Sequence, residues 1–271
     1  MMSQEDRAEL AEESGDLSRA CQLWKELAEN TQDVIYFCRY ADAAERLGAW
    51  SEAEEAYARA LKLCPDLVVA MEGMGALWLS RTDIERKESS TRAIEWLLKA
   101  QGHQRTPRGL TLLGAAYLEL GNNDRAQAGF VEAIQLDPEY EEALYNLAII
   151  RKTADPKNAI SLLEKAVRID PAYSAAHQEL GKLYQQKGDL DLAEMHLRRS
   201  LESDPTDYWT HLFLANLLAV RGEPAEAESL YRFATDLRPE IQAGIEFFAR
   251  FFESTGRHSD ASEVRRRSQA Q

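Results

Sequence analysis

Apolar residues recur along the chain with the spacing of α-helices. In residues 107–140, Leu110, Leu113 and Tyr117 stand at i, i+3 and i+7, which places them on one face of a first helix. Gly114 lies within that stripe, where the missing side chain lets a neighbouring helix approach closely. The pattern predicts an amphipathic helix whose apolar face is buried against another helix.

A second helix follows with a different stripe. Ala126, Phe130 and Ala133 stand at i, i+4 and i+7, so two small residues flank a large one and the two helices can interlock. The segment 121–123 (GNN) supplies the positive φ that ends the first helix. Pro138 stops the second helix because it restricts the residue before it and donates no N–H. One such pair cannot cover its own apolar surface, so pairs must stack.

The same marks return throughout the chain. Residues 107–138 align with residues 174–205, an offset of about two repeats of 34 residues. Glycine recurs after the first helix of a pair, alanine within the second helix and proline after it: Gly15, Gly48, Gly121, Gly188, Gly222 and Gly256; Ala20, Ala53, Ala93, Ala126, Ala159, Ala193, Ala227 and Ala261; Pro65, Pro138, Pro171, Pro205 and Pro239. Over essentially the whole chain, this succession resembles the tetratricopeptide repeat family.

The resemblance implies an all-α fold, an α-solenoid in which about eight helix-turn-helix units wind into a right-handed superhelix. It implies a single solenoid domain over residues 1–271. We place the units at residues 1–33, 34–67, 68–106, 107–140, 141–173, 174–207, 208–241 and 242–271, the last of which is a capping unit.

The third unit is longer than the others. Its extra residues lie near 81–90 (RTDIERKESS), a charged and polar segment between the two expected helices. Such a segment fits a lengthened, solvated turn, and it also fits a protrusion that contacts a partner, since long insertions are often functional.

The first and last helices carry polar residues at positions where the repeat is apolar. These are Gln4 and Arg7 in the first helix, and Arg265 and Ser268 in the last. Terminal repeats need polar outer faces, so we expect a complete array with its own two ends.

The charge balance narrows the class of partner. The chain carries 32 Lys and Arg against 46 Asp and Glu, a formal net charge of −14 that repels nucleic-acid backbones, so we expect no nucleic-acid partner. Residues 1–66 hold 15 acidic and 7 basic groups, over half of the net charge. A protein or peptide partner with a basic segment would be steered toward these N-terminal units. A solvated face that keeps a solenoid soluble explains the same charge.

Signatures of catalysis, metal binding and membrane insertion are missing from the sequence. It contains no zincin, nucleophile-elbow, phosphate-loop or dinucleotide motif. Cys21, Cys38 and Cys64 have neither a disulfide framework nor zinc spacing, and His177 and His211 fall where the repeat packs a ring. The acidic N-terminus lacks the features of a secretory signal, and apolar runs are too short to span a membrane. We expect a cytoplasmic, non-enzymatic protein without cofactor, metal or membrane anchor.

The resemblance also implies where a partner binds. In that family, defined positions of the first helix of each pair line a concave groove that holds peptides. The matching positions near the middle of the chain form a mixed surface with an apolar floor, polar edges and aromatic anchors: Arg108, Thr111, Leu112, Ala115, Glu142, Tyr145, Asn146, Ile149, Lys152, Gln178, Lys182, Trp209, Phe213 and Asn216. Interfaces draw energy disproportionately from Trp, Tyr and Arg, and the amide of Asn146 can pair with a peptide backbone in both directions.

One subtype of the family grips the acidic C-terminal tails of chaperones with lysine, asparagine and arginine side chains from three consecutive units. Asn146 matches its middle element, but Thr111 and Ala115 precede it and Ala175 and Glu179 follow it. Buried carboxylates need charge-assisted donors, which these residues lack. The sequence therefore speaks against chaperone-tail binding.

These observations favour a non-catalytic scaffold or adaptor that binds a peptide or a partner helix in its concave groove. A structural or assembly role that uses the convex face, the ends or self-association stays open. So does a regulatory module that acts on a separate enzyme. The patterns above specify neither the partner nor the oligomeric state.

Overall fold

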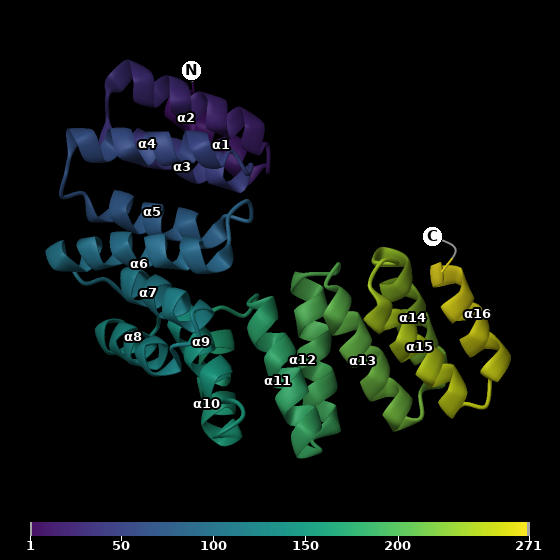
Figure 1. Ribbon diagram of the computed structural model, residues 1–271. Helices are drawn as coiled ribbons and strands as arrows, with labels where there is room; N and C mark the ends of the chain where they lie inside the picture. Colours follow the sequence, from purple (N-terminus) through teal and green to yellow (C-terminus); the bar gives the residue numbers. More distant parts are fainter. Residues whose placement is uncertain (1, 270–271) are drawn as a thin grey trace. The chain divides into compact units, whose positions relative to one another are not determined.

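The computed structural model describes the backbone of residues 2–269 and the side chains of residues 2–266. Within these residues the chain forms sixteen α-helices and no strand, which confirms the all-α solenoid of helix pairs (Figure 1). The first helices of the pairs, called A helices, are α1 (Gln4–Glu13), α3 (Val34–Arg46), α5 (Val68–Ser80), α7 (Pro107–Glu119), α9 (Glu141–Arg151), α11 (Ser174–Lys187), α13 (Tyr208–Arg221) and α15 (Gln242–Ser254). The second helices, called B helices, are α2 (Leu17–Thr31), α4 (Trp50–Leu63), α6 (Arg86–His103), α8 (Asn123–Leu136), α10 (Pro156–Ile169), α12 (Leu190–Ser203), α14 (Pro224–Leu237) and α16 (His258–Gln269).

The helices form two compact units, residues 1–150 and residues 151–271. The A helices α1, α3, α5 and α7 of unit 1 and α11, α13 and α15 of unit 2 pack against the B helix of their own pair. The B helices α2, α4 and α6 of unit 1 and α10, α12 and α14 of unit 2 pack against the A helix that follows. Successive A helices also touch, α3 with α5 and α5 with α7 in unit 1, and α11 with α13 and α13 with α15 in unit 2. We call the side of the A helices that is turned away from the B helices the inner face of each unit.

Close approach of small and large residues holds α7 and α8 together. Phe130 of α8 is fully buried, and Ala126 and Ala133 on either side of it are buried as well. A Cβ atom at Gly114 of α7 would lie 2.6 Å from the Phe130 ring. The interlocking predicted for this pair is therefore confirmed, and the reason for the glycine is the space that the ring occupies.

The turns follow the local signals in the sequence. Gly121 has φ 74°, and its N–H donates to the carbonyl of Leu118 at 2.9 Å, which ends α7. Before α10, Asp155 accepts a hydrogen bond from the N–H of Asn158 at 3.1 Å, and Pro156 occupies the first turn of the helix.

Half of the extra segment in the third pair, residues 86–90, belongs to α6. The helix begins at Arg86, so residues 81–85 alone form the loop, and Ser89 and Ser90 are buried. The Ser89 hydroxyl donates to the carbonyl of Trp78, and the Arg81 guanidinium lies 4.6 Å from the centre of the Trp78 ring. The prediction of a lengthened, solvated turn therefore fits only part of the five-residue loop, because Arg81 packs on Trp78 and Ile84 packs on the core. The rest of the segment is an added helical turn packed on α5.

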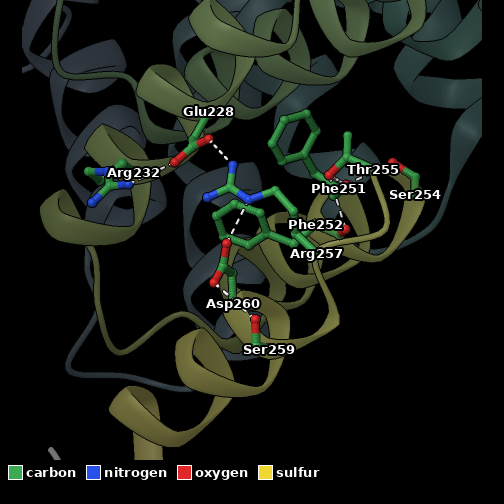
Figure 2. A network of polar contacts seen from close by, with 9 residues as sticks. All are labelled: Glu228, Arg232, Phe251, Phe252, Ser254, Thr255, Arg257, Ser259 and Asp260. Atoms are coloured by element: carbon green, nitrogen blue, oxygen red, sulfur yellow. Dashed lines mark hydrogen bonds and ion pairs between the residues drawn. The ribbon is translucent and has the colours of Figure 1, made fainter.

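Ion pairs fasten the last described helices together. Figure 2 shows Arg257 between Glu228 of α14 and Asp260 of α16. The guanidinium of Arg257 lies 2.5 Å from the Glu228 carboxylate, 2.6 Å from that of Asp260 and 4.4 Å from the centre of the Phe252 ring. Arg265 of α16, which stands at a position where the repeat is apolar, pairs with Glu246 at 2.8 Å. The side chain of Ser268 lies outside the described residues.

Candidate functional site

The predicted binding residues fall on both units, and each unit is described by itself. Unit 1 carries those of α7 and α9, namely Arg108, Thr111, Leu112, Ala115, Glu142, Tyr145, Asn146 and Ile149; unit 2 carries Lys152, Gln178, Lys182, Trp209, Phe213 and Asn216.

In unit 1, two of the predicted residues are engaged within their own helices. Thr111 is 3% exposed, and its hydroxyl donates to the carbonyl of Pro107 at 2.8 Å, so it is not accessible to a partner. The Asn146 amide donates to the carbonyl of Glu142 at 2.8 Å, which uses one donor of the group expected to pair with a peptide backbone. Leu112 is half-buried and presents part of its side chain.

Carboxylates surround Arg108 on the inner face of unit 1. Its guanidinium lies 3.7 Å from the carboxylate of Glu72, which is 4% exposed. Asp42 and Glu45 stand three residues apart on α3, and Glu45 accepts a hydrogen bond from Ser80 at 2.7 Å. Burial raises the pKa of Glu45, and the Ser80 hydrogen bond opposes that shift only in part. This part of unit 1 is therefore acidic around one arginine.

In unit 2, one carboxylate organises two of the predicted lysines. Glu179 of α11 accepts hydrogen bonds from Lys182 at 2.6 Å and from Lys152 at 3.0 Å. Burial raises the pKa of Glu179, but the two ammonium groups outweigh burial and hold the pKa below its usual value. We call Lys152, Glu179 and Lys182 the lysine–glutamate cluster.

Two aromatic rings continue this surface on α13. The ammonium group of Lys182 lies 5.1 Å from the centre of the Phe213 ring, and the Phe213 and Trp209 rings stack with 6.4 Å between centres. Trp209 is 43% exposed. Gln178 donates to Thr210 at 2.7 Å, which ties α11 to α13. The structure thus joins four residues of the predicted set, Lys152, Lys182, Phe213 and Trp209, into one patch.

Sequence reasoning missed the part that Glu179 plays. In the sequence, Glu179 stands where the subtype that binds chaperone tails has a cationic side chain, and its acidic group was taken only as evidence against such a site. The spacing of three residues between Glu179 and Lys182 was the available signal, because it places the two side chains side by side on a helix. The Lys152 contact joins residues that are far apart in sequence and carries no local signal.

A second buried polar group, the pair His177 and His196, lies between α11 and α12. Nε2 of His177 donates to the carbonyl of Pro171 at 3.2 Å, so its Nδ1 accepts from Nδ1–H of His196 at 2.9 Å when both rings are neutral. Both side chains are buried, as is His211, so the packed positions predicted for His177 and His211 are confirmed. Burial, with His177 next to it, lowers the pKa of His196 to about 4.

Acidification is expected to destabilise unit 2 through this histidine pair. The pKa of His196 is about 4 when folded against an ordinary 6.5, so the unfolded chain binds more protons between these values. The contribution to stability is present above pH 6.5 and is lost as the pH falls toward about 4. The Glu164 carboxylate acts in the opposite direction but does not cancel burial. When the pH is lowered from 7.5 to 5, the free energy of unfolding measured in urea should fall by about 1–2 kcal/mol more for wild type than for His196→Leu. Equal losses would contradict this assignment.

The cysteines offer no reactive thiol on the inner faces. Cys38 is buried, and burial raises the pKa of its thiol to about 12. In the described part of the chain, His, Cys, Asp and Glu side chains nowhere gather in a group of three that could hold a metal ion. Across those same residues, none of the helices has the length and apolar character needed to cross a membrane.

Comparison with known proteins agrees with the repeat pattern. Family models described as tetratricopeptide repeat match residues 5–67, 107–140, 151–195 and 179–241. The chain is 25% identical over 245 residues to cellulose synthase operon protein C of Pseudomonas fluorescens, covering 80% of this chain and 18% of that protein. It is 29% identical over 120 residues to the BBSome complex member BBS4 of Bos taurus, covering 44% of this chain and 23% of that protein.

Solved structures share the fold. The chain aligns with the Cut9–Hcn1 hetero-tetramer of the APC/C at a TM-score of 0.75 and 16% identity, covering 90% of this chain and 48% of that one. It aligns with pilF of Pseudomonas aeruginosa at 0.69 and 18% identity, covering 82% and 97%. The chain spans 14–23% of the length of the curated relatives it matches. The matched repeats and the stacked helix pairs together establish that the chain belongs to the tetratricopeptide repeat family.

Proposed function

We propose that the chain is a non-catalytic scaffold that binds a peptide or a partner helix of another protein on the inner faces of its A helices. Proteins of this family generally mediate protein–protein interactions as scaffolds. The observation that carries the proposal is the patch on α13, where Trp209 is 43% exposed and stacks on Phe213. An exposed tryptophan beside a second ring is the type of residue that supplies much of the binding energy at interfaces.

The negative charge of unit 1 supports a partner that is positively charged where it contacts this unit. The acidic groups around Arg108, together with the net charge of residues 1–66, favour a basic segment of the partner there. The proposal includes a cytoplasmic location and no nucleic-acid partner.

Replacing Trp209 and Asn216 together by alanine is expected to weaken capture of the partner by more than about 30-fold, because a central aromatic anchor is lost. The partner is first identified by affinity capture from the source cell and mass spectrometry, and its affinity is then measured by calorimetry. Circular dichroism of the variant checks that its helices are intact.

A control of similar exposure lies on a B helix of unit 2. Phe233 of α14 is 47% exposed and contacts the His211 ring with 4.5 Å between centres, so Phe233→Ala removes an exposed ring that is not part of the patch formed by Lys152, Lys182, Phe213 and Trp209. We expect it to leave the affinity within about twofold. Loss of binding in Phe233→Ala, with the inner-face variant unaffected, would contradict the proposal and favour a scaffold that uses its B helices.

A further inference from the structure

We propose that Lys152 and Lys182 form a receptor for a carboxylate of the bound segment, and that Glu179 occupies this receptor in the free protein. The inference rests on the proposed binding at the inner face. It adds the kind of ligand that unit 2 selects, which is an acidic side chain next to an aromatic one. It also adds a competitor, because the Glu179 carboxylate of the chain itself uses the same donors.

The donors of the two lysines are only partly used. Each ammonium group has three N–H donors, and the hydrogen bonds to Glu179 take one from each. The side chains of Lys152 and Lys182 are 33% and 28% exposed, whereas that of Glu179 is 9% exposed. The lysines therefore face solvent with free donors while the carboxylate lies beneath them, and an incoming carboxylate can form charge-assisted hydrogen bonds from above.

Charge complementarity favours an anion at this point. The lysine–glutamate cluster holds two positive charges and one negative charge, although the whole chain has a formal net charge of −14. A local positive site in an acidic protein attracts acidic segments and excludes basic ones. It differs in sign from the surroundings of Arg108 in unit 1, so the two units select different segments.

The aromatic rings define the neighbour of that carboxylate. Lys182 contacts both Glu179 and the face of Phe213, and Phe213 stacks on the exposed Trp209. A carboxylate bound at the lysines therefore has an aromatic platform beside it. Phenylalanine or tyrosine adjacent to the acidic residue would stack there and add affinity.

Replacing Glu179 separates this proposal from a merely structural role of the cluster, because the two predict opposite changes in the affinity for an acidic peptide. Glutamine has nearly the same shape, but it lacks the charge that competes with the ligand. The two lysines donate to different oxygens of Glu179, and the single carbonyl oxygen of glutamine can replace only one of them because its amide nitrogen is a donor. Glu179→Gln should therefore strengthen binding of an acidic peptide. A merely structural role for the cluster predicts weaker binding from every change within it.

The test uses two synthetic peptides with blocked ends and the full chain. The acidic probe is Gly-Phe-Asp-Phe-Gly, and the neutral probe has asparagine in place of aspartate. Binding is followed by NMR through the indole signal of Trp209, which Trp209→Phe assigns. Wild type should bind the acidic probe at least about fivefold more tightly than the neutral one. Glu179→Gln should raise the affinity for the acidic probe about five- to tenfold and leave the neutral probe within about twofold.

Two further variants complete the design. Lys152→Gln with Lys182→Gln should abolish the preference for the acidic probe. The control Lys157→Gln removes one positive charge from an exposed site on α10 and should preserve the preference. Melting temperatures show that each variant is folded, and if Glu179→Gln is not, the lysine variant decides.

Several results would overturn the inference. One is that neither wild type nor Glu179→Gln binds the acidic probe at about 10 mM. Another is that wild type binds both probes equally, or that the double lysine variant keeps its preference for the acidic probe. The last is that a folded Glu179→Gln binds the acidic probe more weakly than wild type does. Equal binding of both probes that depends on Trp209 would remove the carboxylate receptor but leave the proposed function standing. Loss of the function would appear in the partner-capture experiment instead.

Discussion

Replacing Phe130 by alanine is expected to lower the free energy of unfolding of unit 1 by about 3–5 kcal/mol, the usual cost of removing a buried aromatic ring. The ring is fully buried and packs against the backbone of α7 at Gly114, where no side chain can move in to refill the space. Because repeats contact only their neighbours, the cavity weakens this pair and its contacts with the adjacent pairs.

Urea unfolding monitored by circular dichroism measures this loss. The control is Phe233→Ala, which removes the same side chain from a position that is 47% exposed and where the ring contacts only one other ring, that of His211, in the described residues. It should change the free energy of unfolding by less than about 1 kcal/mol. Similar losses in the two variants would show that the interlocking of Phe130 and Gly114 does not determine the stability of the repeat.

The helix pairs were predictable because their signals are local. Gly121 ends α7 and Pro156 begins α10. Gly114 indicates that a large side chain packs against it. Each of these signals lies within a single repeat of the sequence. The extra segment of the third pair was less clear, since RTDIERKESS has the composition of a solvated loop. Its helical end depends on the burial of Ser89 and Ser90 against α5, which composition does not reveal.

The candidate site was predictable only as a set of positions. Family positions placed Lys152, Lys182, Phe213 and Trp209 on A helices. The structure has Lys152 in the turn that follows α9 and brings the four side chains together. The sequence could not show which groups hold the lysines, because the Lys152 contact to Glu179 depends on how separate helices pack. For the same reason it could not show that Thr111 is buried.

Replacing Gly73 by alanine is expected to lower the free energy of unfolding by about 2–3 kcal/mol, although alanine is the better helix former. A Cβ atom at Gly73 of α5 would overlap the ring of Tyr57, which is buried and donates its hydroxyl hydrogen bond to Asp42. The ring is rigid and enclosed, so relief requires α5 to shift or the hydrogen bond to break.

Gly102 provides the matched control, since it also lies within a helix, α6, but has nothing within 4 Å of an added Cβ atom. Gly102→Ala should raise the free energy of unfolding by about 0.5 kcal/mol through helix propensity alone. The two variants introduce the same methyl group and differ only in what it meets, so opposite signs in urea unfolding would isolate packing against Tyr57 as the cause. A stabilising Gly73→Ala would show that the ring can move aside without cost, and the close approach of α4 and α5 at Gly73 would then not be what requires glycine there.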